Sequence, residues 1–340
     1  MVNILVTGGA GFIGSSFVRQ RAEAQDQVIV IDNLTYAGNL DNLLAIENFN
    51  LDNQFIKGDI GDKNLISKIL EKHEIDWVVN FAAESHVDNS IKNPDPFIET
   101  NILGTYNLLI CARDYYNSKK KLNFKFLHIS TDEVFGELDD EGKFSESSNY
   151  QPNSPYSASK ASSDHLVRAF HHTYGLPTII TNCSNNYGPR QYPEKLIPFM
   201  IYQAINGKPL TIYGDGKNVR DWIYVDDHNI GVYLALTKGK AGETYCLGVN
   251  NEQNNNTIVN LICESLDKLK PRSDSKSYKE QITYITDRLG HDFRYAIDSS
   301  KAEEDLGFKA SISFREGIEN TIKWYLDNYN WLENSLKKTS

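Results

Sequence analysis

Short runs of apolar residues alternate with longer segments of helical periodicity through the first half of the chain. The runs lie at Ile4-Leu5-Val6, Val28-Ile29-Val30-Ile31, Phe55-Ile56, 77–81 and 126–129. Uninterrupted apolar runs are typical of strands buried on both faces, and each intervening segment is long enough for a crossover helix. The pattern predicts an α/β fold with a doubly wound parallel sheet.

The second half of the chain keeps this pattern only in part. Two further strands are expected at 178–180 and 244–247, among longer loops that contain proline and asparagine. We therefore expect a first domain over residues 1–180, to which residues of about 217–247 return. A smaller mixed α/β lobe should take up most of residues 181–340.

Composition narrows the classes of function. The 340 residues include 35 Lys and Arg against 45 Asp and Glu, a net charge of −10, which disfavours nucleic acid and membrane surfaces as partners. No run reaches the roughly 18 apolar residues of a membrane span. The N-terminus lacks the basic region of a signal peptide, so we expect a cytoplasmic protein. The four cysteines lie far apart, and no metal site is expected.

A glycine-rich turn follows the first expected strand. In Gly8-Gly9-Ala10-Gly11-Phe12-Ile13-Gly14 the glycines have the spacing G-x-x-G-x-x-G, a variant of the dinucleotide fingerprint that brings a pyrophosphate to a helix N-terminus. The second strand ends at Asp32, whose carboxylate can accept hydrogen bonds from ribose hydroxyls and repels a 2′-phosphate. Together they predict a Rossmann-type domain that binds NAD rather than NADP.

Two further strand ends are candidates for cofactor contacts. Asp59-Ile60 follows the third strand, from where it can reach an adenine ring, and the small residues Ala82-Ala83 follow the fourth. An aspartate after a strand is also an ordinary helix cap, so this alternative stays open for Asp59.

Reactive side chains are expected at the fifth strand and in the helix that follows it. Tyr156 and Lys160 have the i,i+4 spacing that places both on one helix face, where the lysine can lower the pKa of the tyrosine and bind the cofactor ribose. A tyrosinate is a competent base for a sugar hydroxyl. Thr131-Asp132-Glu133 ends the fifth strand. Two carboxyl groups there can divide acid and base roles, whereas in isolation they would be read as an exposed acidic turn.

With the glycine turn and Asp32, the Tyr-x-x-x-Lys pair indicates the extended short-chain dehydrogenases/reductases, which act on nucleotide sugars. Within them the chain closely resembles the dTDP-glucose 4,6-dehydratase family, over nearly its whole length. The matching segments are residues 32–39, 82–88, 130–136, 156–160, 185–189, 213–216 and 218–222.

The resemblance implies a three-stage reaction on one tightly held NAD, which is regenerated in each turnover. Tyr156 would take the C4 hydroxyl proton during oxidation, Glu133 would remove the C5 proton, and Asp132 would protonate the C6 hydroxyl as water leaves. Return of hydride to C6 would give dTDP-4-keto-6-deoxyglucose. Such a lyase serves deoxysugar biosynthesis of the dTDP-rhamnose type.

The resemblance also implies which residues line the site. Those implied to bind the cofactor are Gly8, Gly11, Phe12, Ile13, Gly14, Asp32, Asn33, Leu34, Thr35, Asp59, Ile60, Phe81, Ala82, Ala83, Ser85, Thr100, Tyr156, Lys160 and Asn186. Those implied to bind the nucleotide sugar are Ser85, Thr131, Asn185, Lys195, Leu196, Thr211, Ile212, Tyr213, Arg220, Asn255, Asp287, Arg288 and His291. Arginine suits a diphosphate because its guanidinium is a bidentate donor.

Two residues depart from the family pattern. Leu289 stands where a proline is usual, and Phe293 stands where an arginine is common. Without the proline the loop is less restricted, so its closure over a substrate should cost more entropy.

Several alternatives stay open. A nucleotide-sugar 4-epimerase would use the same tyrosine, lysine and NAD, but it needs no acid and base for an elimination. A second alternative is a 4,6-dehydratase for another nucleotide, since no side chain here reads thymine unambiguously. A third is a non-catalytic NAD-binding regulator.

Family resemblance further implies a homodimer formed through a four-helix bundle. The candidate helices are residues 94–116 and 156–174. Their apolar faces could equally belong to the protein's own core.

Overall fold

The computed structural model describes residues 2–287 and 292–337, and its largest element is a seven-stranded parallel sheet. The order across the sheet is β10-β6-β5-β4-β1-β2-β3. The bounds are β1 (Asn3–Thr7), β2 (Gln27–Asp32), β3 (Phe55–Lys57), β4 (Trp77–Asn80), β5 (Lys125–Thr131), β6 (Thr178–Cys183) and β10 (Thr244–Leu247). Every apolar run predicted as a strand lies in this sheet, which confirms the doubly wound α/β fold.

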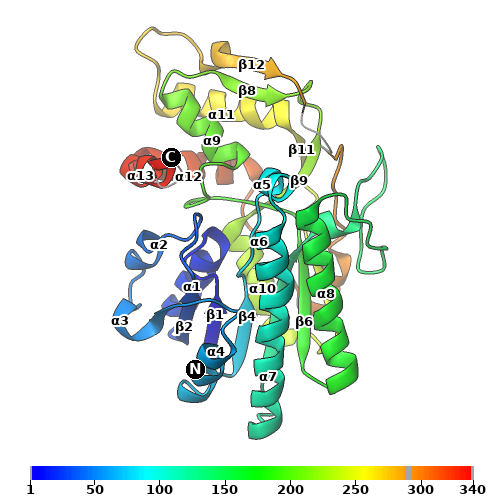
Figure 1. The fold of residues 1–340 in the computed structure, drawn as a ribbon. Helices are drawn as coiled ribbons and strands as arrows, with labels where there is room; N and C mark the ends of the chain where they lie inside the picture. The colour runs from blue at the N-terminus through cyan, green and yellow to red at the C-terminus, as the bar shows by residue number, and fades with distance from the viewer. Residues whose placement is uncertain (1, 288–291, 338–340) are drawn as a thin grey trace.

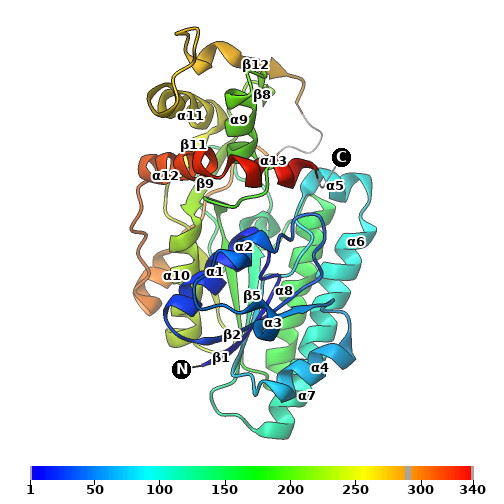
Figure 2. The same cartoon turned by 90° about the vertical axis from the view of Figure 1, so that its left-hand side faces the viewer.

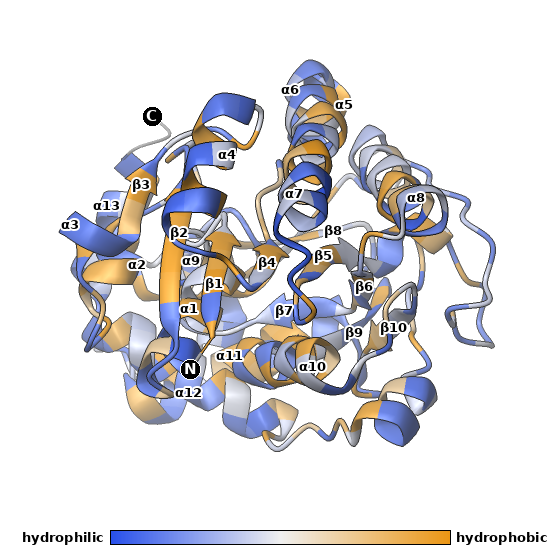
Figure 3. Ribbon diagram, turned by 90° about the horizontal axis from the view of Figure 1, so that it is seen from below, coloured by the Kyte–Doolittle hydropathy of each residue, from blue (hydrophilic) through white to orange (hydrophobic). Residues whose placement is uncertain are grey.

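Helices cover both faces of the sheet, as Figures 1 and 3 show. One face is covered by α1 (Phe12–Glu23) and α10 (Val225–Lys238), and the other by α4 (Lys63–Lys72), α7 (Thr105–Lys119) and α8 (Pro155–Tyr174). The strands are predominantly hydrophobic along their length in Figure 3 because both of their faces are buried. Each face has its own core, with Phe17 and Val232 in one and Leu108 and Phe170 in the other.

A smaller lobe lies beyond the carboxyl ends of the strands (Figure 2). It has a three-stranded sheet, β11-β9-β7, a two-stranded sheet, β12-β8, and a separate hydrophobic core. Its elements are β7 (Asn185–Tyr187), α9 (Leu196–Ile205), β8 (Leu210–Tyr213), β9 (Val219–Tyr224), β11 (Glu252–Asn254), α11 (Asn255–Leu269), β12 (Ile282–Ile285), α12 (Phe314–Asp327) and α13 (Tyr329–Lys337). Of the segment 217–247, α10 and β10 belong to the large sheet's layers, whereas β9 pairs within the lobe.

The remaining elements are short. They are α2 (Asp41–Leu44), α3 (Leu51–Gln54), α5 (Val87–Lys92), α6 (Asp95–Phe97), the π-helical turn η1 (Ile98–Gly104), the 3-10 turns η2 (Asp132–Phe135) and η3 (Tyr278–Gln281), and η4 (Ala302–Leu306). No helix in residues 2–287 and 292–337 is long and apolar enough to cross a bilayer.

The start of α8 fixes two of the reactive side chains. Ser154 and Ser157 form a reciprocal capping box, and Pro155 occupies the first turn, where its missing N–H costs nothing. The helix therefore begins immediately before Tyr156 and places Lys160 one turn later on the same face.

Candidate active site

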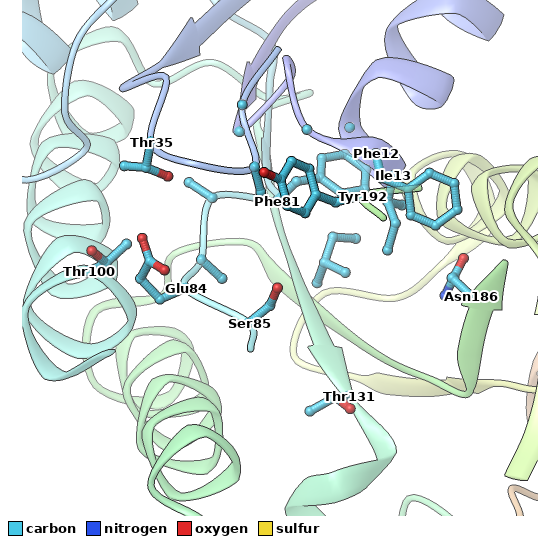
Figure 4. A pocket seen from close by; sticks show the side chains of 18 of the residues that line it. Phe12, Ile13, Thr35, Phe81, Glu84, Ser85, Thr100, Thr131, Asn186 and Tyr192 are labelled. Atoms are coloured by element: carbon cyan, nitrogen blue, oxygen red, sulfur yellow. The ribbon is translucent and has the colours of Figure 1, made fainter. Parts of the chain in front are cut away.

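A cavity of about 310 Å³ lies at the carboxyl ends of β1, β2, β4, β5 and β6, where the chain leaves the large sheet. Doubly wound sheets bind ligands at this edge. Figure 4 looks into it, with Thr35, Glu84 and Thr100 on one side and Asn186 on the other. The residues implied to bind the cofactor that line it are Gly8, Gly11, Phe12, Ile13, Gly14, Asp32, Asn33, Thr35, Asp59, Ile60, Phe81, Ala82, Ala83, Ser85, Thr100, Tyr156, Lys160 and Asn186.

The glycine turn is packed so tightly that larger residues do not fit. A Cβ at Gly14 would lie 2.3 Å from the carbonyl oxygen of Gly8, and one at Gly8, where φ is +67°, would lie 2.7 Å from the backbone nitrogen of Ala82. Glycine is the residue that adopts this conformation at little cost. The first turn of α1 thus stands exposed to the cavity with its backbone N–H groups, a cradle that fits a pyrophosphate.

Asp32 is held at the end of β2 by two backbone donors. Its carboxylate accepts from the N–H of Ala10 at 2.9 Å and from the N–H of Leu34 at 2.8 Å. Burial raises the pKa of Asp32, and these two hydrogen bonds oppose the rise. The fixed carboxyl group suits the ribose hydroxyls of NAD. Leu34, also implied to bind the cofactor, does not line the cavity, and its side chain packs against the core.

Replacing Asp32 by Ala should weaken NAD binding by about 10- to 100-fold, because hydrogen bonds to a charged group contribute roughly 1.5–3 kcal/mol. The affinity for NADP should fall less, since the same change removes a repulsion of the 2′-phosphate. Calorimetric titration with both dinucleotides measures the ratio. Asp140→Ala, at an exposed loop position, is the control, and an unchanged NAD to NADP ratio in Asp32→Ala would contradict the role of Asp32.

The neighbouring carboxyl groups of Asp132 and Glu133 enter the cavity from η2, directly after β5. Thr131 organises them: its hydroxyl accepts from the N–H of Glu133 at 3.3 Å and donates to Asp132 Oδ1 at 3.2 Å. The other oxygen of Asp132, Oδ2, is buried without a hydrogen-bond partner in the described part of the chain. Burial, and secondly the charge of Glu133, raise the pKa of Asp132 to about 8. Asp132 is therefore a protonated acid at neutral pH beside a second carboxyl group.

Tyr156 and Lys160 also line the cavity, yet their electrostatics differ from the expectation. Burial raises the pKa of Tyr156 well above its ordinary value, and Glu133 adds to the rise. Any lowering of this pKa by Lys160 is therefore outweighed by burial. Lys160 donates to the carbonyl of Ile129 at 2.7 Å, and burial lowers its own pKa to about 8.

Only part of the implied nucleotide-sugar set lines this cavity. Ser85, Thr131, Asn185 and Lys195 do, and Lys195 Nζ donates to the carbonyl of Ser85 at 3.1 Å. Those outside it are Leu196, Thr211, Ile212, Tyr213, Arg220, Asn255 and Asp287. The side chain of Ile212 is buried in the lobe's core, whereas Tyr213 is 41% exposed.

Arg220 is buried behind the cavity rather than exposed in it. Its Nη1 donates to the carbonyl of Phe293 at 3.1 Å and its Nη2 to the carbonyl of Asp292 at 2.8 Å. The guanidinium also lies 4.3 Å from the ring centre of Tyr295. Its charge acts to lower the pKa of Asp132, against the burial of that group. Arg220 thus holds the backbone around Phe293 and acts on Asp132 through its charge.

The structure describes only the ends of the loop that contains Leu289 and Phe293, the two departures from the family pattern. Arg288, Leu289 and His291 lie outside the described residues. Phe293 is 38% exposed, and its carbonyl accepts from the N–H of Val219 at 2.8 Å. The backbone contacts that anchor this part of the loop do not depend on the side chain at position 293.

Sequence reasoning missed several residues that line the cavity. They are Ile31, Ala37, Gly38, Gly58, Glu84, Ile129, Ser130, Cys183, Ser184, Gln191, Tyr192 and Glu194. Glu194 is the most informative, because it accepts from the hydroxyl of Tyr36 at 3.0 Å and so joins the lobe to the loop after β2. Its position in the sequence, immediately before Lys195, could have indicated that it lies at the cavity. Among the described residues no cluster has the composition of a metal site.

Comparison with known proteins agrees with this geometry. A family model described as GDP-mannose 4,6 dehydratase matches residues 5–321. A dTDP-glucose 4,6-dehydratase of Xanthomonas campestris is 54% identical over 339 residues, which cover 99% of this chain and 96% of that protein. This chain is a member of the dTDP-glucose 4,6-dehydratase family.

Solved structures of the family and its neighbours superpose on this dehydratase over nearly their full length. The dTDP-glucose 4,6-dehydratase of Streptomyces venezuelae, with NAD and TYD bound, has a TM-score of 0.89 and 44% identity and covers 98% of this chain and 99% of its own. A UDP-glucose 4-epimerase of Thermotoga maritima has a TM-score of 0.85 and 30% identity, with coverages of 96% and 99%. The fold is therefore shared with epimerases.

Proposed function

We propose that this chain is an NAD-dependent hydro-lyase that converts dTDP-glucose to dTDP-4-keto-6-deoxyglucose and water. The observation that carries the proposal is the pair Asp132 and Glu133 beside Tyr156 in one cavity, with Asp132 protonated at neutral pH. An elimination needs an acid and a base at adjacent carbons, whereas a 4-epimerase does not. A non-catalytic regulator would have no use for the pair.

The cofactor site is formed by the glycine turn, Asp32 and Lys160, and its tight backbone cradle fits a dinucleotide. When bound, NAD supplies a hydride acceptor and donor together with a positive charge near Tyr156. Tyr156 takes the proton of the C4 hydroxyl as that carbon is oxidised. Lys160, one helical turn away, adds a cationic group that counters the burial of the phenol.

The acid and base then act on the 4-keto sugar. Oxidation at C4 acidifies the C5 hydrogen, which Glu133 removes. Asp132 delivers its proton to the C6 hydroxyl, so that water leaves and a C5–C6 double bond forms. Glu133 returns a proton to C5 when hydride arrives at C6. The Thr131 hydroxyl holds the carboxyl group of Asp132 and the backbone N–H of Glu133.

Incubation of the purified protein with dTDP-glucose should produce the alkali-induced absorbance of a 4-keto sugar, at turnover numbers within the usual enzymatic range of about 1–10³ per second. Parallel reactions with UDP-, CDP- and GDP-glucose test the specificity for the nucleobase of the substrate. We expect dTDP-glucose to give the highest kcat/KM. A C4 epimer without the absorbance would establish the epimerase alternative instead.

We assign the binding of the nucleotide to the smaller lobe. We infer that residues 1–180, with the returning residues 217–247, hold NAD, and that residues 181–340 mainly hold the nucleotide sugar. Tyr213 supports this because its exposed ring offers a flat surface to a base at the end of β8. Arg288 and His291, which lie outside the described residues, stay candidates for binding the diphosphate on the strength of the family resemblance. We place the enzyme in the cytoplasm, which fits its four free, buried cysteines.

We further propose a homodimer formed through η1–α7 and α8. Ile98, Leu103, Tyr106 and Tyr174 are large apolar residues on these elements that are 38–52% exposed. Exposed apolar groups on adjacent helices are typical of subunit interfaces.

Leu103→Asp should convert the dimer to a monomer, because a buried, unpaired carboxylate in the interface costs several kcal/mol. Sedimentation equilibrium measures the change. Leu122→Asp is the matched control, since Leu122 is 98% exposed in the loop after α7 and the same charge there should leave the dimer intact. A wild-type monomer at micromolar concentration would reject the dimer.

A further inference from the structure

A buried polar cluster adjoins Lys160, and the reaction described above does not use it. It consists of His128 on β5 and Asp164 on α8, which are 0% and 2% exposed, together with the groups that hold them. Lys160 itself is 4% exposed. Buried charges are costly unless they are compensated, so these groups must compensate one another.

His128 lies between the two charged groups. Its Nε2 is 3.2 Å from Lys160 Nζ and 3.5 Å from Asp164 Oδ1. On the other side of the ring, the amide of Asn80 lies 3.1 Å from Nδ1, and the hydroxyl of Thr7 donates to Asn80 Oδ1 at 2.6 Å. Nε2 thus lies between the ammonium group and the carboxylate, on the edge of the ring opposite the Asn80 amide.

Asp164 is fixed through its other oxygen. Oδ2 accepts from the hydroxyl of Ser130 at 2.7 Å and from that of Tyr150 at 2.9 Å, with the amide of Asn182 at 3.4 Å. Oδ1 has no hydrogen-bond partner in the described part of the chain. Three side chains thus hold one oxygen, while the other lies 3.5 Å from His128 Nε2.

The pKa values of the groups in the cluster also indicate that Asp164 and Lys160 influence one another. Burial, followed by the charge of Lys160, lowers the pKa of His128 well below its usual value, so the ring is neutral. Burial lowers the pKa of Lys160 to about 8, and Asp164 is the largest influence in the opposite direction, ahead of Cys183 on β6. Burial raises the pKa of Asp164, but Lys160 and the three donors oppose that rise.

We propose that Asp164 is a positioning residue for the reaction, whose buried carboxylate keeps Lys160 cationic and therefore able to bind the cofactor and assist Tyr156. His128 transmits the effect as a neutral, oriented spacer between the two charges. Asp164 reaches neither substrate nor cofactor, because it does not line the cavity. The inference rests on the proposed function, in which Lys160 acts as a cation.

The test follows the ionisation of Lys160 directly. The pH dependence of turnover cannot serve as the test by itself. The pKa of Asp132 is also about 8, so its titration would change the rate over the same pH range. In the full chain with ¹³C-labelled lysine, the Cε resonance of Lys160, assigned with Lys160→Arg, is titrated with and without NAD. In Asp164→Asn the midpoint should fall by about 1–3 pH units, the usual effect of losing a nearby opposite charge. The affinity for NAD above neutral pH should fall with it.

Three further variants keep the outcome decisive. Asp164→Glu retains the charge and should keep the midpoint near that of the wild type. Tyr150→Phe removes one donor to the carboxylate and should give a smaller shift in the same direction; it replaces Asp164→Asn if that variant does not fold. Asp140→Asn makes the same change at an exposed position and should leave the titration midpoint of Lys160 unchanged.

The inference is overturned if the Lys160 midpoint is unchanged in Asp164→Asn, or in Tyr150→Phe where that variant must stand in for it. It is also overturned if NAD affinity falls equally at every pH, which is the sign of a purely structural role. Wild-type turnover of dTDP-glucose is measured in parallel. Its absence would refute the proposed function, whereas the titration of Lys160 reports on Asp164 in either case.

Discussion

Asp132→Asn is expected to lower the rate of product formation by about 10²–10⁴-fold while leaving NAD bound, because the amide cannot deliver a proton to the C6 hydroxyl. The steps before water loss should survive. Exchange of the C5 hydrogen with deuterium from solvent, read by mass spectrometry, should therefore continue although no 4-keto-6-deoxy sugar accumulates. Normal product formation would show that another group is the acid.

The pH dependence of the wild type gives a second measurement of the same residue. The acid is active in its protonated form, and the pKa of Asp132 is about 8. Water loss should accordingly be fastest below about pH 8 and decline as the pH rises through that value. Glu133→Gln is the paired variant: it should abolish C5 exchange, which Asp132→Asn retains, because the two carboxyl groups act on different atoms.

Tyr156→Phe should have an equally large effect but at an earlier stage. Without the phenolic oxygen no group takes the C4 hydroxyl proton, so oxidation should slow by about 10²–10⁴-fold. Both C5 exchange and product formation should disappear together, since each follows the oxidation. The KM for dTDP-glucose should change little, because the change affects the chemical step more than ground-state binding.

The control for Tyr156→Phe is Tyr36→Phe, which also removes a phenolic oxygen close to the cavity. Tyr36 donates to Glu194, so its loss should alter the fit of the lobe and hence KM rather than C4 oxidation. If Tyr156→Phe retained C5 exchange, the base for C4 would have to be a different residue.

The strands, the glycine turn and the acid and base pair could be predicted from the sequence, because each depends on local chemistry. Continuous apolar runs specify buried strands wherever they occur, and a spacing such as that of Tyr156 and Lys160 specifies one helix face. The ends of strands then gather at one edge of the sheet without further information.

Contacts between distant segments could not be predicted in this way. The burial of Ile212 depends on helices that pack over β8, and the binding of Arg220 to backbone carbonyls depends on a loop about 70 residues further along the chain. The pKa of Tyr156 was misjudged for the same reason: burial exceeds the effect of a lysine one turn away, and burial is a property of the whole fold.

Ser184 is the single residue between β6, in the large sheet, and β7, in the sheet of the lobe. It is buried, and its N–H donates to the carbonyl of Leu247 at 3.1 Å. The two sheets therefore meet through one buried residue that itself lines the cavity, and its neighbours Cys183 and Asn185 carry the cavity lining from the large sheet directly into the lobe. The surface that holds a cofactor and the surface that holds a sugar are thus continuous along the backbone at this point.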